Sequence, residues 1–341
     1  MFDALKLWVP RDFMKSGPSN GPPLAVRARN LTRTFESGVG VHDLELDIER
    51  GTIFGFIGPS GSGKTTTIRL MTGVLARESG ELAVFGEDPF EFLPSERARL
   101  GYMPQLNVLY PELSLAENLG FCASLFGMPW RGRRQRMQEV LDLVELTDAS
   151  RRLLRESSGG MQRRLSLAAT LIHDPDLLFL DEPTAGVDPV LRRKFWDHFS
   201  TLRDDGRTML VTTQYVGEAA YCDWVGVMAE GRLVTVDTPE GLRRQAFGGD
   251  VVDLTLAAPV GYAELDQMVR VSGATNSERL SLNQVRLVVD SAGDVTPLLS
   301  TWAADNGVEI ESINEYLPPF DDVFVELINQ LASASTEAND V

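Results

Sequence analysis

Residues Gly58 to Thr65, GPSGSGKT, match the pattern G-x-x-x-x-G-K-[ST]. The apolar run TIFGFI precedes the pattern, and a run with helical spacing, IRLMTGVL, follows it, so strand, loop and helix come in the order that the pattern requires. In such a loop backbone N–H groups face a β-phosphate, the lysine reaches the β- and γ-phosphates, and the hydroxyl ligates Mg²⁺. We therefore predict a phosphate site, in preference to a chance glycine-rich turn, at Gly58, Pro59, Ser60, Gly61, Ser62, Gly63, Lys64, Thr65 and Thr66.

A second pattern that could do chemistry is an apolar run, LLFL, that ends in the carboxylates Asp181 and Glu182. Charge at the end of a buried strand is stable only if something offsets its desolvation. Asp181 would hold Mg²⁺, directly or through water, and Glu182 would polarise the water that attacks a γ-phosphate. Alone, the pair fits an ordinary acidic turn; together with the upstream loop, it predicts nucleotide hydrolysis.

The elements that must position these residues alternate between strands and helices. LAVRARNLTRTF and DLELDIER have the period of antiparallel strands, whereas the continuous apolar runs at LLFLD and RTMLVTT predict buried parallel strands with crossing helices. A more helical and charged region extends from about Ser114 to Leu154. After Pro239, short strands and helices alternate in a way that is typical of a split βαβ arrangement. We expect an α/β core followed by a small α+β domain.

The expected domain boundaries follow from changes in composition. The linker-like stretch SGPSNGPP ends a flexible extension at residues 1–23, whose apolar start fits a frayed tail or a segment on a membrane or partner surface. A nucleotide-hydrolysing domain should span residues 24–239, with a helical subdomain at about 106–165. Residues 240–332 would form an accessory domain or an extension of the core fold, and residues 333–341 a disordered tail.

Charge and cysteine content exclude several classes of protein. The 341-residue chain has 49 acidic and 32 basic side chains, a net charge of −17, which argues against nucleic acid as the main partner. The two cysteines, Cys122 and Cys222, have no metal-type spacing and suit a reducing compartment. The sequence contains no apolar run of the roughly 18 to 20 residues that cross a bilayer and no signal-peptide pattern. We expect a cytoplasmic protein.

Between the two motifs, residues 157–164, SSGGMQRR, strongly resemble the signature motif of ATP-binding cassette (ABC) proteins. The resemblance implies an α/β fold with a P-loop NTPase core, an antiparallel β subdomain and a helical subdomain. It also implies that Ser158, Gly159 and Gly160 contact the γ-phosphate held by a second subunit, in a head-to-tail dimer with two composite ATP sites. Without the resemblance, the same residues indicate a helix cap and turn.

Other landmarks fall in the order of the family. Gln105 resembles the Q-loop glutamine that senses Mg²⁺ and the attacking water, and Asp188 belongs to a D-loop-like run, AGVD. Phe35 stands where an aromatic stacks on adenine, although a core phenylalanine explains it nearly as well. Gln214 stands where most members carry a histidine that contacts the γ-phosphate. Because an amide N–H still donates a hydrogen bond, we expect slower but real hydrolysis.

The branch of the family is indicated by SSGGMQRRLSLAATLIHDPDLLFLDEPTAGVDP and PPFDDVFVELI, which look like the drug, antibiotic and lipid exporter branch. Met161, in place of a common glutamine, is frequent there. The resemblance implies an ATPase with ATP and Mg²⁺ as cofactors. Its partners would be an integral membrane permease and a second ATP-binding subunit, at the inner face of the cell membrane. The alternative is a regulatory ABC-type ATPase that remodels a soluble complex.

Overall fold

The computed structural model describes residues 23–36 and 38–339, which form two compact units that divide between Val236 and Asp237. The division falls three residues before the predicted one because Thr238 already caps a helix of the second unit, accepting a hydrogen bond from Gly241 N at 3.0 Å. Nearly all of the predicted N-terminal extension lies outside the described residues. Among the described helices, none combines the length and apolar composition needed to cross a bilayer.

The first unit is built on a six-stranded sheet with the order β5-β6-β7-β3-β8-β9. Its strands are β3 (Ile53–Ile57), β5 (Leu100–Met103), β6 (Leu177–Asp181), β7 (Thr208–Thr213), β8 (Trp224–Ala229) and β9 (Arg232–Asp237). The pairs β5–β6, β6–β7, β7–β3 and β3–β8 are parallel, and every residue of β3, β6 and β7 is buried, as the continuous apolar runs predict. The carboxyl ends of β3, β6 and β7 therefore meet at one edge, where α/β proteins bind ligands.

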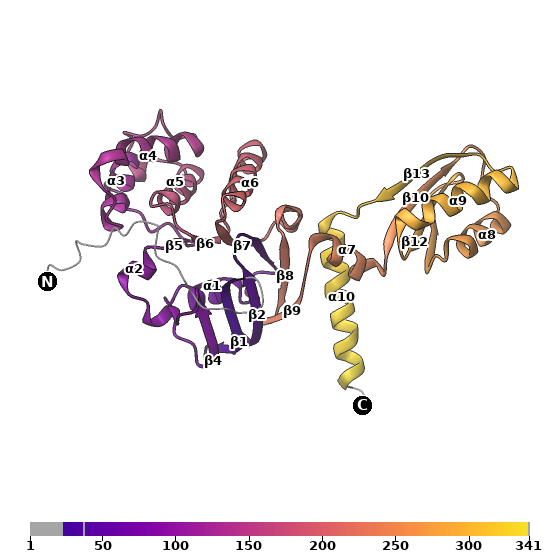
Figure 1. Ribbon diagram of the computed structural model, residues 1–341, viewed down its shortest axis with the longest axis horizontal. Coiled ribbons are helices and arrows are strands. Elements are labelled where there is room, and N and C mark those ends of the chain that lie inside the picture. The colour runs from indigo at the N-terminus through magenta and orange to yellow at the C-terminus, as the bar shows by residue number, and fades with distance from the viewer. Residues whose placement is uncertain (1–22, 37, 340–341) are drawn as a thin grey trace. The chain divides into compact units, whose positions relative to one another are not determined.

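A three-stranded antiparallel sheet packs on this core. It has the order β2-β1-β4, with β1 (Leu24–Thr34), β2 (Gly40–Glu49) and β4 (Ser79–Val84). Helix α1 (Lys64–Met71) lies beside these strands in Figure 1, and its Ile68 and Met71 share one buried cluster with residues of both sheets. The antiparallel β subdomain predicted from the alternating pattern is present.

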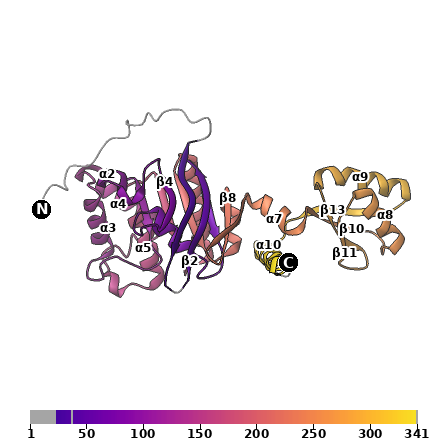
Figure 2. The ribbon, with the colours of Figure 1, turned by 90° about the horizontal axis from the view of Figure 1, so that it is seen from below.

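A group of helices completes the unit: α3 (Leu115–Leu125), α4 (Trp130–Leu143), α5 (Gly159–Leu171) and α6 (Pro189–Asp204). Short helical turns lie at η1 (Pro89–Glu91), α2 (Pro94–Arg97), η2 (Leu154–Glu156) and η3 (Val216–Tyr221). Helix α3 begins with a capping box in which Ser114 Oγ accepts from Glu117 N and the Glu117 carboxylate accepts from Ser114 N. Figures 1 and 2 both place α3, α4 and α5 together, away from β1 and β2.

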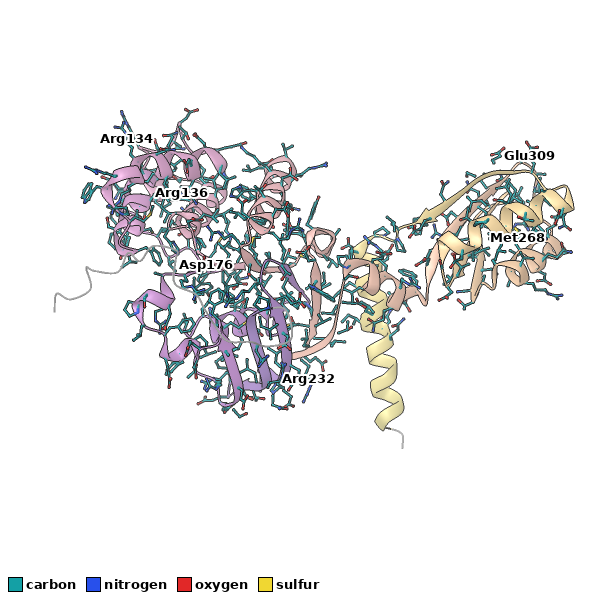
Figure 3. The ribbon with its side chains drawn as sticks, in the orientation of Figure 1. Arg134, Arg136, Asp176, Arg232, Met268 and Glu309 are labelled. Carbon is teal, nitrogen blue, oxygen red and sulfur yellow. The ribbon has the colours of Figure 1, made fainter. Side chains whose placement is uncertain are left out.

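The second unit contains α7 (Pro239–Phe247), β10 (Asp250–Leu256), α8 (Tyr262–Ser272), β11 (Asn276–Arg279), β12 (Gln284–Val289), α9 (Ala292–Asn306), β13 (Ile310–Tyr316) and α10 (Phe320–Asn339). Its sheet has the order β11-β12-β10-β13, and all pairs are antiparallel. This is the β-α-β-β-α-β arrangement predicted from the sequence. Met268 of α8, labelled in Figure 3, is fully buried in a core that belongs to this unit alone.

The end of the chain differs from the prediction of a disordered tail. Helix α10 continues to Asn339, so residues 333–339 are helical, and only 340–341 lie outside the described part of the tail. The run from Phe320 contains no glycine or proline that would end a helix before this point. The polar composition after Ser333 was therefore a poor guide to where the helix stops.

Candidate nucleotide and hydrolysis site

The phosphate-binding loop joins β3 to α1 at the carboxyl edge of the parallel sheet. Lys64, the first residue of α1, is 6 % exposed, and its ammonium donates to the carbonyl oxygens of Gly58 at 2.7 Å and Pro59 at 2.9 Å. Burial lowers the pKa of Lys64, while the nearby carboxylates of Glu182 and Asp181 act to raise it. The ammonium thus lies inside the loop and in the field of both carboxylates.

Two glycines of the loop stand where no larger residue fits. A Cβ on Gly58 would lie 2.2 Å from the carbonyl oxygen of Met228. A Cβ on Gly63, whose φ is 103°, would lie 2.9 Å from the carbonyl oxygen of Gly40. The loop backbone is therefore held against β8 and the start of β2, and it turns into α1 with Thr65 half-buried at its first turn.

Asp181 ends β6 and is the strongest candidate for a metal ligand. It is 1 % exposed; its Oδ1 accepts a hydrogen bond from Thr212 Oγ1 at 2.5 Å, whereas its Oδ2 is buried without a partner in the described part of the chain. A buried carboxylate oxygen without a donor is costly, and a cation beside it would remove that cost. The residues thus fit a bound Mg²⁺.

The surroundings of Asp181 suit Mg²⁺ rather than a metal held by the protein alone. Among the described residues, no group of three or more His, Cys, Asp or Glu side chains could hold a metal ion. Mg²⁺ is commonly bound by one or two protein oxygens together with substrate phosphates and water. Asp181, at the end of β6, and the hydroxyl of Thr65, in the first turn of α1, would supply such oxygens.

Glu182 follows directly and has an unusual backbone conformation. Its φ is 55°, in the left-handed region that few residues other than glycine occupy. Its N–H donates to Thr212 O at 3.0 Å and to Thr212 Oγ1 at 3.1 Å. Thr212 therefore contacts both members of the carboxylate pair, through the side chain of Asp181 and the backbone N–H of Glu182.

Gln214 follows the end of β7 and meets Glu182 across this edge. Its side-chain amide Nε2 donates a hydrogen bond to Glu182 Oε1. The sequence predicted a contact between Gln214 and a γ-phosphate; the structure instead shows its amide on the carboxylate that would activate water. The two roles are compatible because the amide carries a second N–H.

Glu218, in η3, was not singled out from the sequence. It is 3 % exposed, and its two carboxylate oxygens accept from Thr184 Oγ1 at 2.7 Å and from Thr213 Oγ1 at 2.6 Å. It thereby ties the loop after Glu182 to the residue before Gln214. A single glutamate after a strand gives no pattern that could have marked it.

Gln105 lies two residues beyond the end of β5, which pairs in parallel with β6. Its side chain is exposed, and its backbone carbonyl accepts from Arg163 Nη1 at 2.7 Å. The loop that begins at Gln105 therefore leaves the sheet beside the carboxylate pair. Its assignment as a metal and catalytic residue remains a prediction.

The signature residues lie at the exposed start of α5. Ser158 caps this helix by accepting from Met161 N at 3.3 Å, as the helix-cap interpretation expects, and Gly159 has open space where a Cβ would be. Asp188 caps α6 in the same way, accepting from Val190 N at 3.1 Å and Leu191 N at 3.0 Å. Capping does not exclude a ligand from another subunit at these termini.

Phe35 follows β1 and is 39 % exposed, so the interpretation as a core residue is wrong. Its backbone N–H donates to Val39 O at 2.9 Å, in a turn that leads to Gly40 beside the phosphate-binding loop. The guanidinium of Arg33 lies 5.5 Å from the ring centroid. The ring is available for stacking on a base, which stays a prediction.

The chain is similar to known proteins over most of its length. The sequence profile of the family described as ABC transporter matches residues 41–185. A probable multidrug ABC transporter ATP-binding protein, YbhF of Escherichia coli strain K12, is 37 % identical over 231 residues, which are 68 % of this chain but only 40 % of that protein's length. The daunorubicin resistance ATP-binding protein DrrA2 of Streptomyces coeruleorubidus is 34 % identical over 322 residues, 93 % of this chain and 98 % of that protein.

The fold has solved counterparts. A dimeric ATP-binding cassette in a post-hydrolysis state, bound to ADP and Pi, matches with a TM-score of 0.58 and 25 % sequence identity, over 62 % of this chain and 98 % of the other. The matched share corresponds in size to the first unit.

Proposed function

Because this chain belongs to the ABC transporter family of ATP-binding proteins, we propose that it binds and hydrolyses ATP to power a membrane exporter. The observation that carries the proposal is the carboxylate pair at the end of β6. Asp181 accepts from Thr212 through Oδ1 and has a second oxygen that is buried without a partner among the described residues, whereas the Glu182 carboxylate accepts from the amide of Gln214. The two acids thus have separate environments for separate tasks.

In the proposed mechanism, the loop from Gly58 to Thr65 holds the phosphates through its N–H groups and Lys64. Bound Mg²⁺, held by Thr65 and Asp181 with Gln105 near it, would neutralise charge on the phosphates. Glu182 accepts a proton from the attacking water and so acts as general base. Gln214 keeps the Glu182 carboxylate oriented, and its second N–H would be available to donate to the γ-phosphate.

A second copy of the cassette completes the site in this proposal. Ser158, Gly159 and Gly160 begin a helix whose first residues, Ser158 and Gly159, are exposed, which suits a γ-phosphate presented by another subunit. ATP between two such surfaces would stabilise a head-to-tail dimer, and its hydrolysis would release it. We expect a homodimer.

The membrane partner would dock beside the loop that follows Gln105. Four large apolar side chains are exposed there and on α3: Leu106 at 76 %, Val108 at 71 %, Tyr110 at 49 % and Phe121 at 42 %. The rings of Tyr110 and Phe121 meet edge to face at 4.9 Å. An exposed apolar patch of this kind is typical of an interaction site, and a permease here would place the chain at the cytoplasmic face of the membrane.

Export is favoured over the remodelling of a soluble complex by the names of similar proteins. Those with long matches are called Nod factor export and daunorubicin resistance ATP-binding proteins. The accessory unit after Asp237 has its own core, which suits a separate role such as holding two cassettes together.

The dimer is tested by sizing purified Glu182→Gln protein with saturating ATP and Mg²⁺. We expect a dimer that disappears when ATP is removed, since the variant binds but does not hydrolyse. Adding Ser158→Arg should keep the protein monomeric, because the arginine blocks the signature surface. A monomer in Glu182→Gln under all conditions would count against the composite site.

A further inference from the structure

The side chain of Arg163 reaches from α5 into the gap between two loops of the site. Its Nη1 donates to Pro104 O at 2.8 Å and to Gln105 O at 2.7 Å. The other side of the guanidinium contacts the end of β6: Nη2 donates to Glu182 O at 2.6 Å and also to Asp181 O, and Nε donates to Glu182 O at 3.1 Å. One cation therefore binds four backbone carbonyls from two segments, 104–105 and 181–182. Gln105 and Glu182 are 77 residues apart in the sequence.

These hydrogen bonds matter most for Glu182 because its backbone conformation is unfavourable. A residue other than glycine stays at a φ of 55° only if its surroundings fix it. The N–H of Glu182 donates to Thr212, and its carbonyl accepts from Arg163 and, at 3.2 Å, from Ala185 N. Without Arg163, the carbonyl loses both guanidinium bonds and keeps the longer bond from Ala185 N, so the residue is less restrained against relaxing toward ordinary values of φ.

Only an arginine can make this set of contacts. The guanidinium is a flat fork with donors on both sides, so one side can serve the segment at Gln105 while the other serves Asp181 and Glu182. A lysine ammonium keeps the charge, but its donors all lie on one nitrogen atom. It can therefore bind the carbonyls on only one side of the gap at a time. Burial lowers the pKa of Arg163, and the charges of Asp181 and Glu182 act against this shift, so the cation matches its surroundings.

We propose that Arg163 is a positioning residue that fixes the catalytic conformation of Glu182 and links it to the loop starting at Gln105. A displacement of that loop, where the membrane partner is proposed to dock, moves the carbonyls of Pro104 and Gln105 and so shifts the guanidinium that restrains Glu182. The inference rests on the proposed ATPase function and adds the residue through which hydrolysis responds to the partner.

The test measures ATP turnover and ATP affinity of the full chain with Mg²⁺ for wild type, Arg163→Met and Arg163→Lys. Arg163→Met should lower kcat roughly 10- to 100-fold, because a small displacement of the base is enough for such a loss. The Kd for ATP should change less than about threefold, since the Lys64 loop has none of these contacts. Arg163→Lys should recover part of the lost kcat.

Arg164→Met is the matched control. Arg164 is the next residue of the same helix and also donates to backbone carbonyls, but these belong to Val144 at 2.9 Å and Glu145 at 3.3 Å, outside the site. Its kcat should stay within about twofold of wild type. Equal losses of kcat in the Arg163→Met and Arg164→Met proteins would overturn the inference, as would a folded Arg163→Met protein with wild-type kcat.

If Arg163→Met does not fold, the lysine variant decides. A wild-type kcat in Arg163→Lys would overturn the inference, because lysine cannot span the gap; a lower kcat at unchanged Kd would support it. Failure of the wild-type protein itself to hydrolyse ATP would be a different result, which contradicts the proposed function rather than the role of Arg163.

Discussion

The side-chain amide of Gln214 donates a hydrogen bond to the carboxylate of Glu182. The two residues follow different strands, β7 and β6, which pair in parallel so that Thr212 lies beside Asp181. The amide keeps its hydrogen atoms at every pH near neutrality, whereas an imidazole in its place would titrate. An uncharged amide therefore orients the proposed general base, and the protonation state of the amide does not change with pH.

Replacing Gln214 should slow hydrolysis without weakening ATP binding. Gln214→Ala removes the donor to Glu182, and we expect kcat at saturating ATP to fall about 10-fold, with little change in KM. Gln214→His should keep most of the turnover, because the ring can also donate. Unchanged turnover in Gln214→Ala at saturating ATP would show that this position is irrelevant to the reaction.

Thr212 should contribute to the stability of the fold because its hydroxyl donates to Asp181 and accepts from the N–H of Glu182. Thr212→Val keeps the shape but leaves Asp181 Oδ1 without its donor, as Oδ2 already is. We expect a loss of about 1–3 kcal/mol in the free energy of unfolding, measured with urea in the absence of nucleotide. Thr201→Val is the control: Thr201 is exposed and its hydroxyl donates to Asp197 O, four residues earlier in the same helix, so its effect should stay within about 0.5 kcal/mol. Equal effects of the two changes would contradict the role of Thr212.

His173 should make the free energy of unfolding depend on pH. Its ring stacks on Phe126 at 3.6 Å, and its Nε2 is 2.9 Å from Leu100 O. Burial lowers the pKa of His173 from 6.5 to about 4. Between these values the unfolded chain binds the extra proton, so the stabilisation is complete above about pH 6.5 and is lost as the pH falls toward 4.

The loss should reach about 3 kcal/mol for this residue. Burial also lowers the pKa of His198, and other groups titrate in the same range, so His173 is isolated by comparison with His173→Gln, which is neutral at every pH. Urea unfolding at about pH 7 and about pH 4.5 should show a smaller loss on acidification in the variant. The same loss in both proteins would refute the assignment.

Much of the site was predictable because its signals are local in sequence. The phosphate-binding loop lies between a strand and a helix, as expected, and the strand before Asp181 is fully buried. The period of short strands and helices after Pro239 also predicted the sheet of the second unit. These features depend on neighbouring residues, whose types restrict the backbone directly.

The contacts that organise the site were not predictable in the same way. Arg163 bonds to carbonyl groups, which every residue has, and Glu218 bonds to hydroxyls in two separate loops, so no spacing of residue types marks either one. The left-handed backbone at Glu182 is likewise imposed by its neighbours in space rather than by its own preference. The exposure of Phe35 was not predictable either, because its position after a strand fits a buried side chain as well as an exposed one.

The most direct test is ATP turnover by wild-type protein beside Glu182→Gln, each with and without Mg²⁺. We predict turnover in the wild type that requires Mg²⁺ and falls at least about 100-fold in Glu182→Gln, while ATP still binds to the variant. Turnover that persists without Mg²⁺, or that is equal in the two proteins, would contradict the assignment of Asp181 and Glu182 and with it the proposed motor.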